Sequence, residues 1–281
     1  MTTEAVSAAI LPPRFVWRGL LWPLLFTVAW GWLIYQMPAL VESGFPTIAA
    51  RLMSYGLVAL GLWLGLEAAD LTPRQRRTTW LAVVVPVTLW AAIAWTAAIN
   101  GVFRTGFSPL PLLPAAIFLP VIGGVPLIVL SKRVGQVLDA VPDTWLVALQ
   151  VYRVLGVQWL AYWMRGLLPT VFALPAGTGD VLTGLFALQA AIAVAAGTAR
   201  GRRAVIYWNI FGLADFAIAI TMGMIVSSGQ FQFIAPDVSG VGVDTFPNVL
   251  TPAFVVPSSV LLHVLSIRQL LRRGRTEAAP R

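Results

Sequence analysis

About eight stretches of roughly 20 predominantly apolar residues recur along this chain of 281 residues, and they limit its fold more than any other feature. A helix of about 20 residues spans the ~30 Å hydrocarbon core of a bilayer. Within that core every backbone N–H and C=O needs a partner inside the protein, so such stretches form helices. We therefore predict an all-α, polytopic transmembrane helix bundle. Its spans are predicted at 15–35, 52–69, 79–99, 110–130, 144–164, 175–197, 205–227 and 249–267.

Composition supports a membrane environment and excludes several classes of function. The chain is 58% apolar and 11% charged, whereas about a quarter of residues are charged in soluble domains. The predicted partner for most of its surface is therefore the lipid bilayer. The net charge of +8 does not indicate nucleic-acid binding, because the arginines lie in short clusters between apolar stretches. Without cysteine the chain has no disulfide, thiolate metal site or cysteine nucleophile.

The distribution of basic residues predicts the orientation. Three basic residues, Arg51, Arg104 and Arg165, fall in the predicted connections on one side, and Arg153 falls inside a span. By the positive-inside rule, both termini are cytoplasmic. We predict a multi-pass protein of the bacterial cytoplasmic (inner) membrane, with its first apolar run kept as a span and not removed as a signal. The other side holds 15 basic residues, namely Arg14, Arg18, Arg74, Arg76, Arg77, Lys132, Arg133, Arg200, Arg202, Arg203, Arg268, Arg272, Arg273, Arg275 and Arg281.

Three connections have recognisable patterns. Segment 132–143 has helical apolar spacing and predicts a short helix on the inner membrane face, with Pro142 ending it and Asp143 capping the next span. Segment 167–179 is rich in Gly and Pro and predicts broken backbone at the membrane edge. Segment 229–248 is either a lid or a simple connector, and the sequence does not separate the two.

The chain is predicted to form a single integral-membrane domain, 1–281. The arginine clusters at 74–77 and 200–203 follow the second and sixth spans, which would fit two four-helix halves, 1–143 and 144–281. The alternative is that inner loops attract arginine without any duplication.

Strong polar residues inside spans concentrate in the second half, whereas the first four spans hold hardly any. Ionisable groups at the bilayer centre cost about 2.5–3.5 kcal/mol, so they indicate function or a buried partner. We therefore place the function in the second half. The predicted substrate-binding residues are Gln150, Arg153, Asp180, Asn209, Asp215 and His263.

Residue counting places Arg153 and Asp215 near the same depth, about 14–15 Å into their spans, and predicts that they pair. The pair either locks two helices together or serves a site, with Arg153 neutralising an anion or Asp215 carrying a proton or cation. His263 is the only histidine, so it cannot form a bis-histidine haem or zinc site. It is predicted to make an interhelical hydrogen bond, with a single axial ligand as the alternative. No metal site or cofactor is predicted.

Gly177-Thr178-Gly179-Asp180 resembles the Gly-x-Gly-Asp motif of intramembrane aspartyl proteases, the presenilin, signal-peptide-peptidase and prepilin-peptidase group. Such chemistry needs two carboxylates that share a proton around a water molecule. The resemblance implies that Asp180 and Asp215 would be the catalytic pair. In that group the other aspartate lies one span before the motif, whereas Asp215 lies one span after it.

The second half also resembles an uncharacterised family of bacterial multi-pass membrane proteins. The resemblance rests on Gln150-Val-Tyr-Arg153, the stretch 175–180, Trp208-Asn209, Asp215, Phe246-Pro247 and His263. It implies no activity, substrate or cofactor.

The function predicted is binding or passage of a small solute or a proton through the polar residues of the second half. Phosphate-binding, zinc-protease and nucleophile-elbow motifs do not occur in the chain, so the prediction favours a protein that is not an enzyme. The alternatives are an intramembrane aspartyl-type hydrolase and a structural subunit that binds other membrane proteins.

Overall fold

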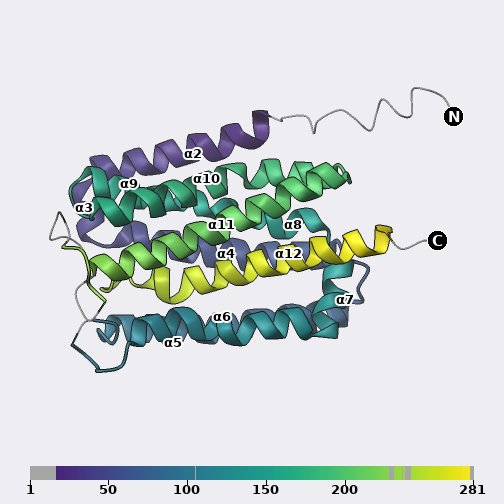
Figure 1. Cartoon of the computed structure of the whole chain (residues 1–281), viewed down its shortest axis with the longest axis horizontal. Coiled ribbons are helices and arrows are strands. Elements are labelled where there is room, and N and C mark those ends of the chain that lie inside the picture. Colours follow the sequence, from purple (N-terminus) through teal and green to yellow (C-terminus); the bar gives the residue numbers. More distant parts are fainter. Residues whose placement is uncertain (1–16, 105, 228–230, 236, 238–241, 279–281) are drawn as a thin grey trace.

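The computed structural model describes residues 17–278 apart from 105, 228–230, 236 and 238–241. Every regular element in these residues is a helix, as predicted (Figure 1). In chain order they are α2 (Trp17–Gln36), α3 (Pro38–Glu42), α4 (Phe45–Glu67), α5 (Pro73–Ile99), α6 (Leu112–Leu130), α7 (Lys132–Ala140), α8 (Asp143–Ala148), the 3₁₀-helix η1 (Leu149–Gly156), α9 (Val157–Met164), α10 (Thr170–Ala195), α11 (Ala199–Val226), the π-helix η2 (Thr251–Val255) and α12 (Val256–Ala278).

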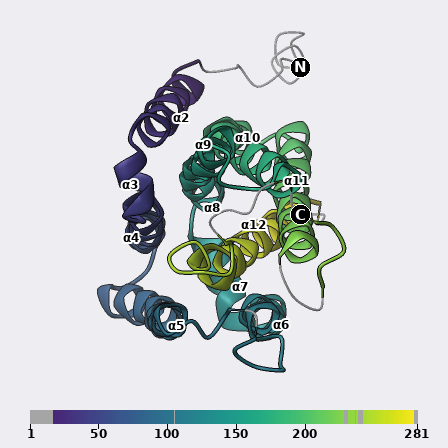
Figure 2. The ribbon, with the colours of Figure 1, turned by 90° about the vertical axis from the view of Figure 1, so that its left-hand side faces the viewer.

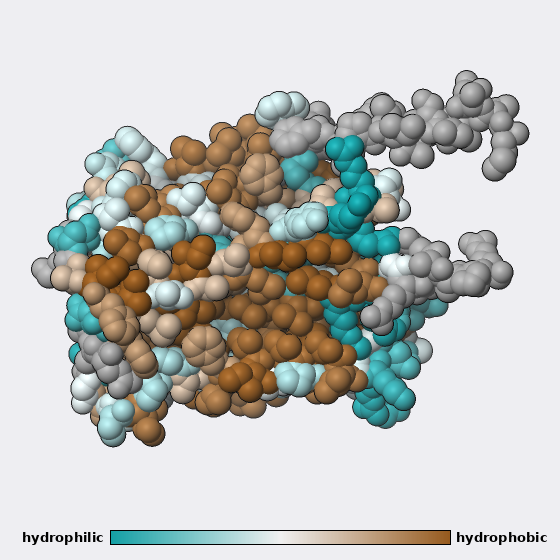
Figure 3. Space-filling view, in the orientation of Figure 1, coloured by the Kyte–Doolittle hydropathy of each residue, from teal (hydrophilic) through white to brown (hydrophobic). Residues whose placement is uncertain are grey.

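Seven helices in the described residues are long and apolar enough to cross a membrane: α2, α4, α5, α6, α10, α11, and η2 with the first part of α12. Between α7 and α10, the chain crosses the bundle once more through the short helices α8, η1 and α9 (Figure 1). The start of α2 and the end of α12 therefore lie at the same end of the bundle. A broad apolar surface separates the two ends (Figure 3), which is the architecture of an integral membrane protein.

The two ends differ in polarity. We call the end formed by α7, the starts of α5 and α11 and the last turns of α12 the basic end, because arginine clusters lie there and its surface is hydrophilic (Figure 3). The opposite end carries the α5–α6 and α11–η2 connections, and we call it the loop end (Figure 1). Arg14 and Arg281 lie outside the described residues, and the side chains of Arg18 and Arg275 are not described.

The helices are not equivalent in position. Viewed along the bundle, α2, α4, α5 and α6 form an arc beside a group that contains α9, α10, α11 and α12 (Figure 2). Within that group α10 contacts η1, α8, α9 and α11. Its glycines allow this close packing, because a Cβ at Gly184 would overlap the backbone of Val154 in η1. The candidate site lies in this tightly packed group.

Two local predictions need correction. The short helix α7 is present as predicted, but Pro142, and not Asp143, is the N-cap of α8. Asp143 lies in the first turn and pairs with Arg273 at 3.3 Å. The predicted break at 167–179 is limited to 167–169, because α10 begins at Thr170 and continues through Pro175. The interruptions lie instead in η1 and η2.

The third correction concerns Arg51, which was expected in a connection. Helix α4 begins at Phe45, seven residues before the predicted span, after Gly44 with its positive φ of 69°. Pro46 lies in the first turn, where proline favours a helix start because its missing N–H is not needed. Arg51 is therefore inside the helix and only 5% exposed.

Candidate functional site

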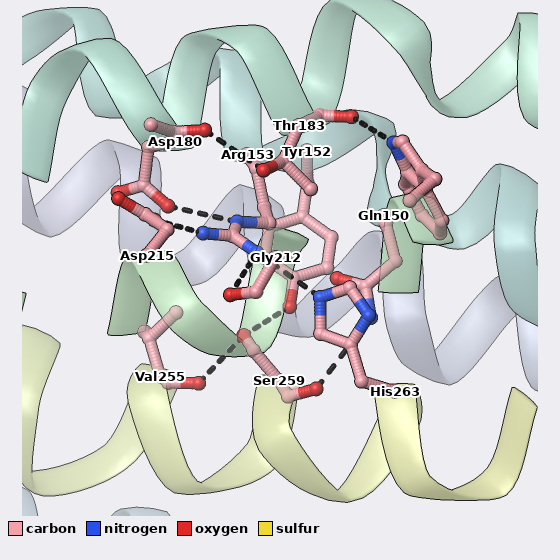
Figure 4. A network of polar contacts seen from close by, with 12 residues as sticks. Gln150, Tyr152, Arg153, Asp180, Thr183, Gly212, Asp215, Val255, Ser259 and His263 are labelled. Carbon is pink, nitrogen blue, oxygen red and sulfur yellow. Dashed lines mark hydrogen bonds and ion pairs between the residues drawn. The ribbon is translucent and has the colours of Figure 1, made fainter. Parts of the chain in front are cut away.

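The guanidinium of Arg153 is the centre of a buried polar network (Figure 4). Its Nε donates to Asp180 Oδ1 at 2.8 Å, and its Nη2 donates to Asp215 Oδ2. Its Nη1 donates to the Gly212 carbonyl at 3.2 Å, and Cζ lies 3.9 Å from the ring centre of Phe216. The predicted partnership of Arg153 with Asp215 is confirmed, and Asp180 is a second partner that the pairing argument did not include.

The backbone around Arg153 explains how these groups come together. Arg153 lies in η1, whose eight residues make it long for a 3₁₀-helix, and runs of this kind often mark functional positions. A Cβ at Gly156 would overlap Asp180, and a Cβ at Gly179 would overlap the Asp215 carboxylate. Glycine is therefore required where η1, α10 and α11 bring their charges together.

The Gly-x-Gly-Asp sequence has the same packing explanation. Gly177 faces Leu160 of α9, and a Cβ there would lie 2.7 Å from that side chain. Gly179 faces Asp215, as described above. Both motif glycines thus allow neighbouring helices to approach α10, and this requirement is independent of proteolysis.

His263 extends the network toward the basic end. Its Nε2 lies 3.0 Å from Arg153 Nη1, and because a guanidinium only donates, Nε2 accepts. Nδ1 therefore carries the proton and donates to Asn209 Oδ1 at 2.8 Å. Asn209 donates in turn to Ser266 Oγ at 3.1 Å. The predicted interhelical hydrogen bonding of His263 is confirmed, and both ring nitrogens are occupied by it.

Gln150 belongs to a separate hydrogen-bonded group on α12, beside the network around Arg153. Its Nε2 donates to the Ser259 carbonyl at 3.5 Å, and the hydroxyl of Ser259 is hydrogen-bonded to the Tyr152 hydroxyl (Figure 4). All six residues predicted as a binding set thus lie in one region of the bundle.

A cavity of about 310 Å³ lies between this network and the loop end, and we call it the vestibule. Its walls are mainly apolar and aromatic, with Trp159, Phe172 and Ile220 among them. Of the charged residues Arg153, Asp180 and Asp215, Asp180 alone lines the vestibule. Its side chain is 18% exposed, against 1% for Arg153 and 5% for Asp215. Asp180 therefore joins the buried charges to an accessible space.

Sequence analysis missed several members of this region. Ser259 and Ser266 were not in the predicted binding set, although they lie four residues before and three residues after His263, on the same face of α12. Arg51 was missed because the start of α4 was placed too late, although Pro46 was the signal for it. Gly212 contributes only its carbonyl, which no sequence pattern indicates.

Comparison with known proteins identifies a family and no activity. A family model described as "Domain of unknown function (DUF8737)" matches residues 110–271, which extend from just before α6 into α12 and include the whole network around Arg153. No curated protein and no solved structure matches the chain.

Proposed function

The chain belongs to the family of the domain of unknown function DUF8737, and from the geometry of its site we propose that it binds a small organic solute in the vestibule above Asp180. The observation that carries this proposal is a cavity of about 310 Å³ whose wall includes the partly exposed carboxylate of Asp180. Arg104 and Asp244, which have opposite charges, also line it. Small-molecule sites are typically apolar cavities of about 300–1,000 Å³ with a few placed polar groups, and the vestibule fits this description.

The charges favour a solute that carries a cationic or hydrogen-bond-donating group. Asp180 and Asp215 together have two negative charges, whereas the guanidinium that they share has one. The trio is therefore formally negative, and Asp180 is its accessible member. An apolar or aromatic body would contact the walls, and a donor group would reach the Asp180 carboxylate.

The side of entry follows from the charge distribution. The vestibule is lined by residues of the loop end, opposite the basic end. By the positive-inside rule, the loop end faces away from the cytoplasm. With the resemblance of the second half to bacterial multi-pass proteins, this supports a cytoplasmic-membrane protein with both termini inside that takes its solute from the outer side.

The same geometry favours binding over proton passage. A proton relay needs groups that both donate and accept and that can change protonation. The path from Arg153 through His263 to Ser266 contains a guanidinium, which only donates, and the amide of Asn209. These two groups interrupt a relay.

An aspartyl hydrolase is the less supported alternative. Its two carboxylates must share one proton around a water. Here the Arg153 guanidinium donates to both Asp180 and Asp215 and so lies between them, in the position that the catalytic water would need. A structural role in a larger membrane complex stays a prediction that measurement of the oligomeric state would test.

The absence of cysteine allows a direct test by substituted-cysteine labelling. We expect Ala176→Cys and Ala219→Cys, on two walls of the vestibule, to react with small methanethiosulfonates added from the outer side. Ala187→Cys, fully buried and not in the vestibule wall, is the matched control and should not react. A cationic reagent should react faster than an anionic one of similar size, and Asp180→Asn should reduce that ratio.

Two results would contradict the proposal. Ala176→Cys and Ala219→Cys could be no more reactive than Ala187→Cys, which would mean that solutes do not reach the vestibule. Alternatively, the ratio of the two reagents could be the same with and without the Asp180 carboxylate, which would remove its role in selecting cations.

A further inference from the structure

Arg51 is a second buried arginine, and its environment differs from that of Arg153. It comes from α4, is 5% exposed, and its Nε and Nη2 are buried without a hydrogen-bond partner in the part of the chain that the structure describes. Its guanidinium carbon lies 5.7 Å from the ring centre of Trp159. A buried guanidinium that no acceptor contacts is costly, so an acceptor is expected beside it.

A small cavity of about 20 Å³ lies beside Arg51, and we call it the Arg51 chamber. Thr251 also lines it, and Thr251 Oγ1 is buried without a hydrogen-bond partner among the described residues. Two donors without acceptors therefore border the same space. The hydroxyl-bearing residues Ser54, Tyr152 and Ser259 also line it, together with the charged pair Arg153 and Asp180.

The size of the chamber restricts its occupant. A cavity needs about 10–15 Å³ of space open to the centre of a water-sized sphere in order to hold one water. The Arg51 chamber therefore accommodates one water or one monatomic ion. An organic group of the solute proposed above is too large for it. This site is therefore separate from the vestibule, although Asp180, Phe216, Thr251 and Val256 line both cavities and form the partition between them.

The charged residues around the chamber favour an anion over a water molecule as its occupant. Arg153 has two carboxylates on its guanidinium, whereas no carboxylate is hydrogen-bonded to Arg51. An anion would supply the missing negative charge and accept from both Arg51 and Thr251. Asp180 and Arg153 also line the chamber and pair with each other at 2.8 Å, so its wall holds two guanidinium groups and one carboxylate and is formally positive.

We propose that the Arg51 chamber binds one halide-sized inorganic anion, with the Arg51 guanidinium and the Thr251 hydroxyl as its donors. The site connects α4 of the first half with η1 and η2 of the second half. Binding of the anion thus stabilises the contact between the arc and the helices that carry the site. The proposal does not depend on which solute, if any, enters the vestibule.

The test uses the purified full-length protein in lipid nanodiscs. Chloride and bromide should raise the Tm saturably relative to gluconate at equal ionic strength, because only an ion that fits the chamber binds the folded state. Equilibrium binding of radioactive chloride should reach one ion per chain. Arg51→Leu should abolish both effects, whereas Arg104→Leu, which removes an arginine from the vestibule wall, should leave both unchanged.

The outcomes separate the possibilities. Loss of binding in Arg104→Leu but not in Arg51→Leu would place the anion in the vestibule and overturn the proposal. Absence of saturable chloride binding to the wild type would mean that the chamber holds water, which also overturns it. If Arg51→Leu does not fold, Thr251→Val provides the second variant, and it should weaken chloride binding at least tenfold. Unchanged binding in that variant would count against the proposed donors.

Discussion

Helices α5 and α6 differ from α10 and α12 in how they use their surfaces, whereas α4 and α11 have the same buried share, 28%. In α5 and α6, 11% and 17% of the residues in the span are buried, whereas in α10 and α12 the shares are 44% and 56%. The first group presents large apolar side chains outward, and the second encloses the charges around Arg153. Similar hydropathy therefore serves two purposes here, contact with lipid in the first group and enclosure of a site in the second.

The two buried arginines give the largest expected contrast between these regions. Arg153→Leu leaves the carboxylates of Asp180 and Asp215 without their shared cation, so we expect a loss of about 3–5 kcal/mol in the free energy of unfolding. In gluconate buffer without chloride, Arg51→Leu is the matched control and should cause no such loss, since it leaves no carboxylate unpaired. Equilibrium denaturation in mild detergent measures the free energy of unfolding of both variants.

A further variant sharpens that result. Replacing Arg153 and Asp215 together still leaves Asp180 unpaired, so much of the stability should return only when Asp180→Asn is added to Arg153→Leu and Asp215→Leu. If Arg51→Leu proves as damaging as Arg153→Leu, the distinction between the two halves is wrong.

Glycine substitutions give the next largest contrast. Gly184→Ala on α10 places a Cβ against the backbone of η1, and overpacking of this kind costs about 1–3 kcal/mol. Gly123→Ala on α6 meets no atom within 4 Å and should be neutral or slightly stabilising. Thermal unfolding of the two variants makes the comparison, and equal losses would show that α6 is packed as tightly as α10.

A smaller effect is expected where the arc contacts η2. Pro257 has no N–H to donate to the carbonyl of Ala253, and Trp90 of α5 donates its indole Nε1–H to that carbonyl at 3.0 Å. Trp90→Phe should therefore lower the free energy of unfolding by about 0.5–1.5 kcal/mol. Trp32→Phe, 63% exposed on α2, is the control that should show no change. The prediction fails if the two substitutions have the same effect.

The smallest effect concerns pH at the basic end, where α7 contacts α12. The hydrogen bond from the Arg272 guanidinium holds the pKa of Asp139 below its usual value of 3.8. The folded-state pKa is lowered, so this contact contributes its stability above about pH 4 and loses it as the pH falls through the lowered value. The difference in Tm between wild type and Asp139→Asn should be constant near neutral pH and disappear in acid. If the difference in Tm persists in acid, it arises from packing and not from the charge of Asp139.

Sequence reasoning predicted the helical class, the segments and the polar residues of the second half, because each depends on local patterns. The depth of Arg153 and Asp215 follows from helix rise alone, and their pairing followed from it. Helix rise did not predict the contact of Asp180 with the same guanidinium. The start of α10 was placed at Pro175, so Asp180 was taken to lie near the membrane edge.

Hydropathy along the chain is enough to predict membrane-spanning helices, since only helices satisfy the backbone of such apolar runs in lipid. The sequence also determined which spans contain charges that need partners. The irregular geometry of η1 and η2, the approach of Asp180 and Asp215 to one arginine at glycine positions, and the lack of a carboxylate partner for Arg51 depend on the packing of the helices. The physical reason is that hydropathy acts along each segment, whereas close packing and ion pairing depend on which segments become neighbours in space.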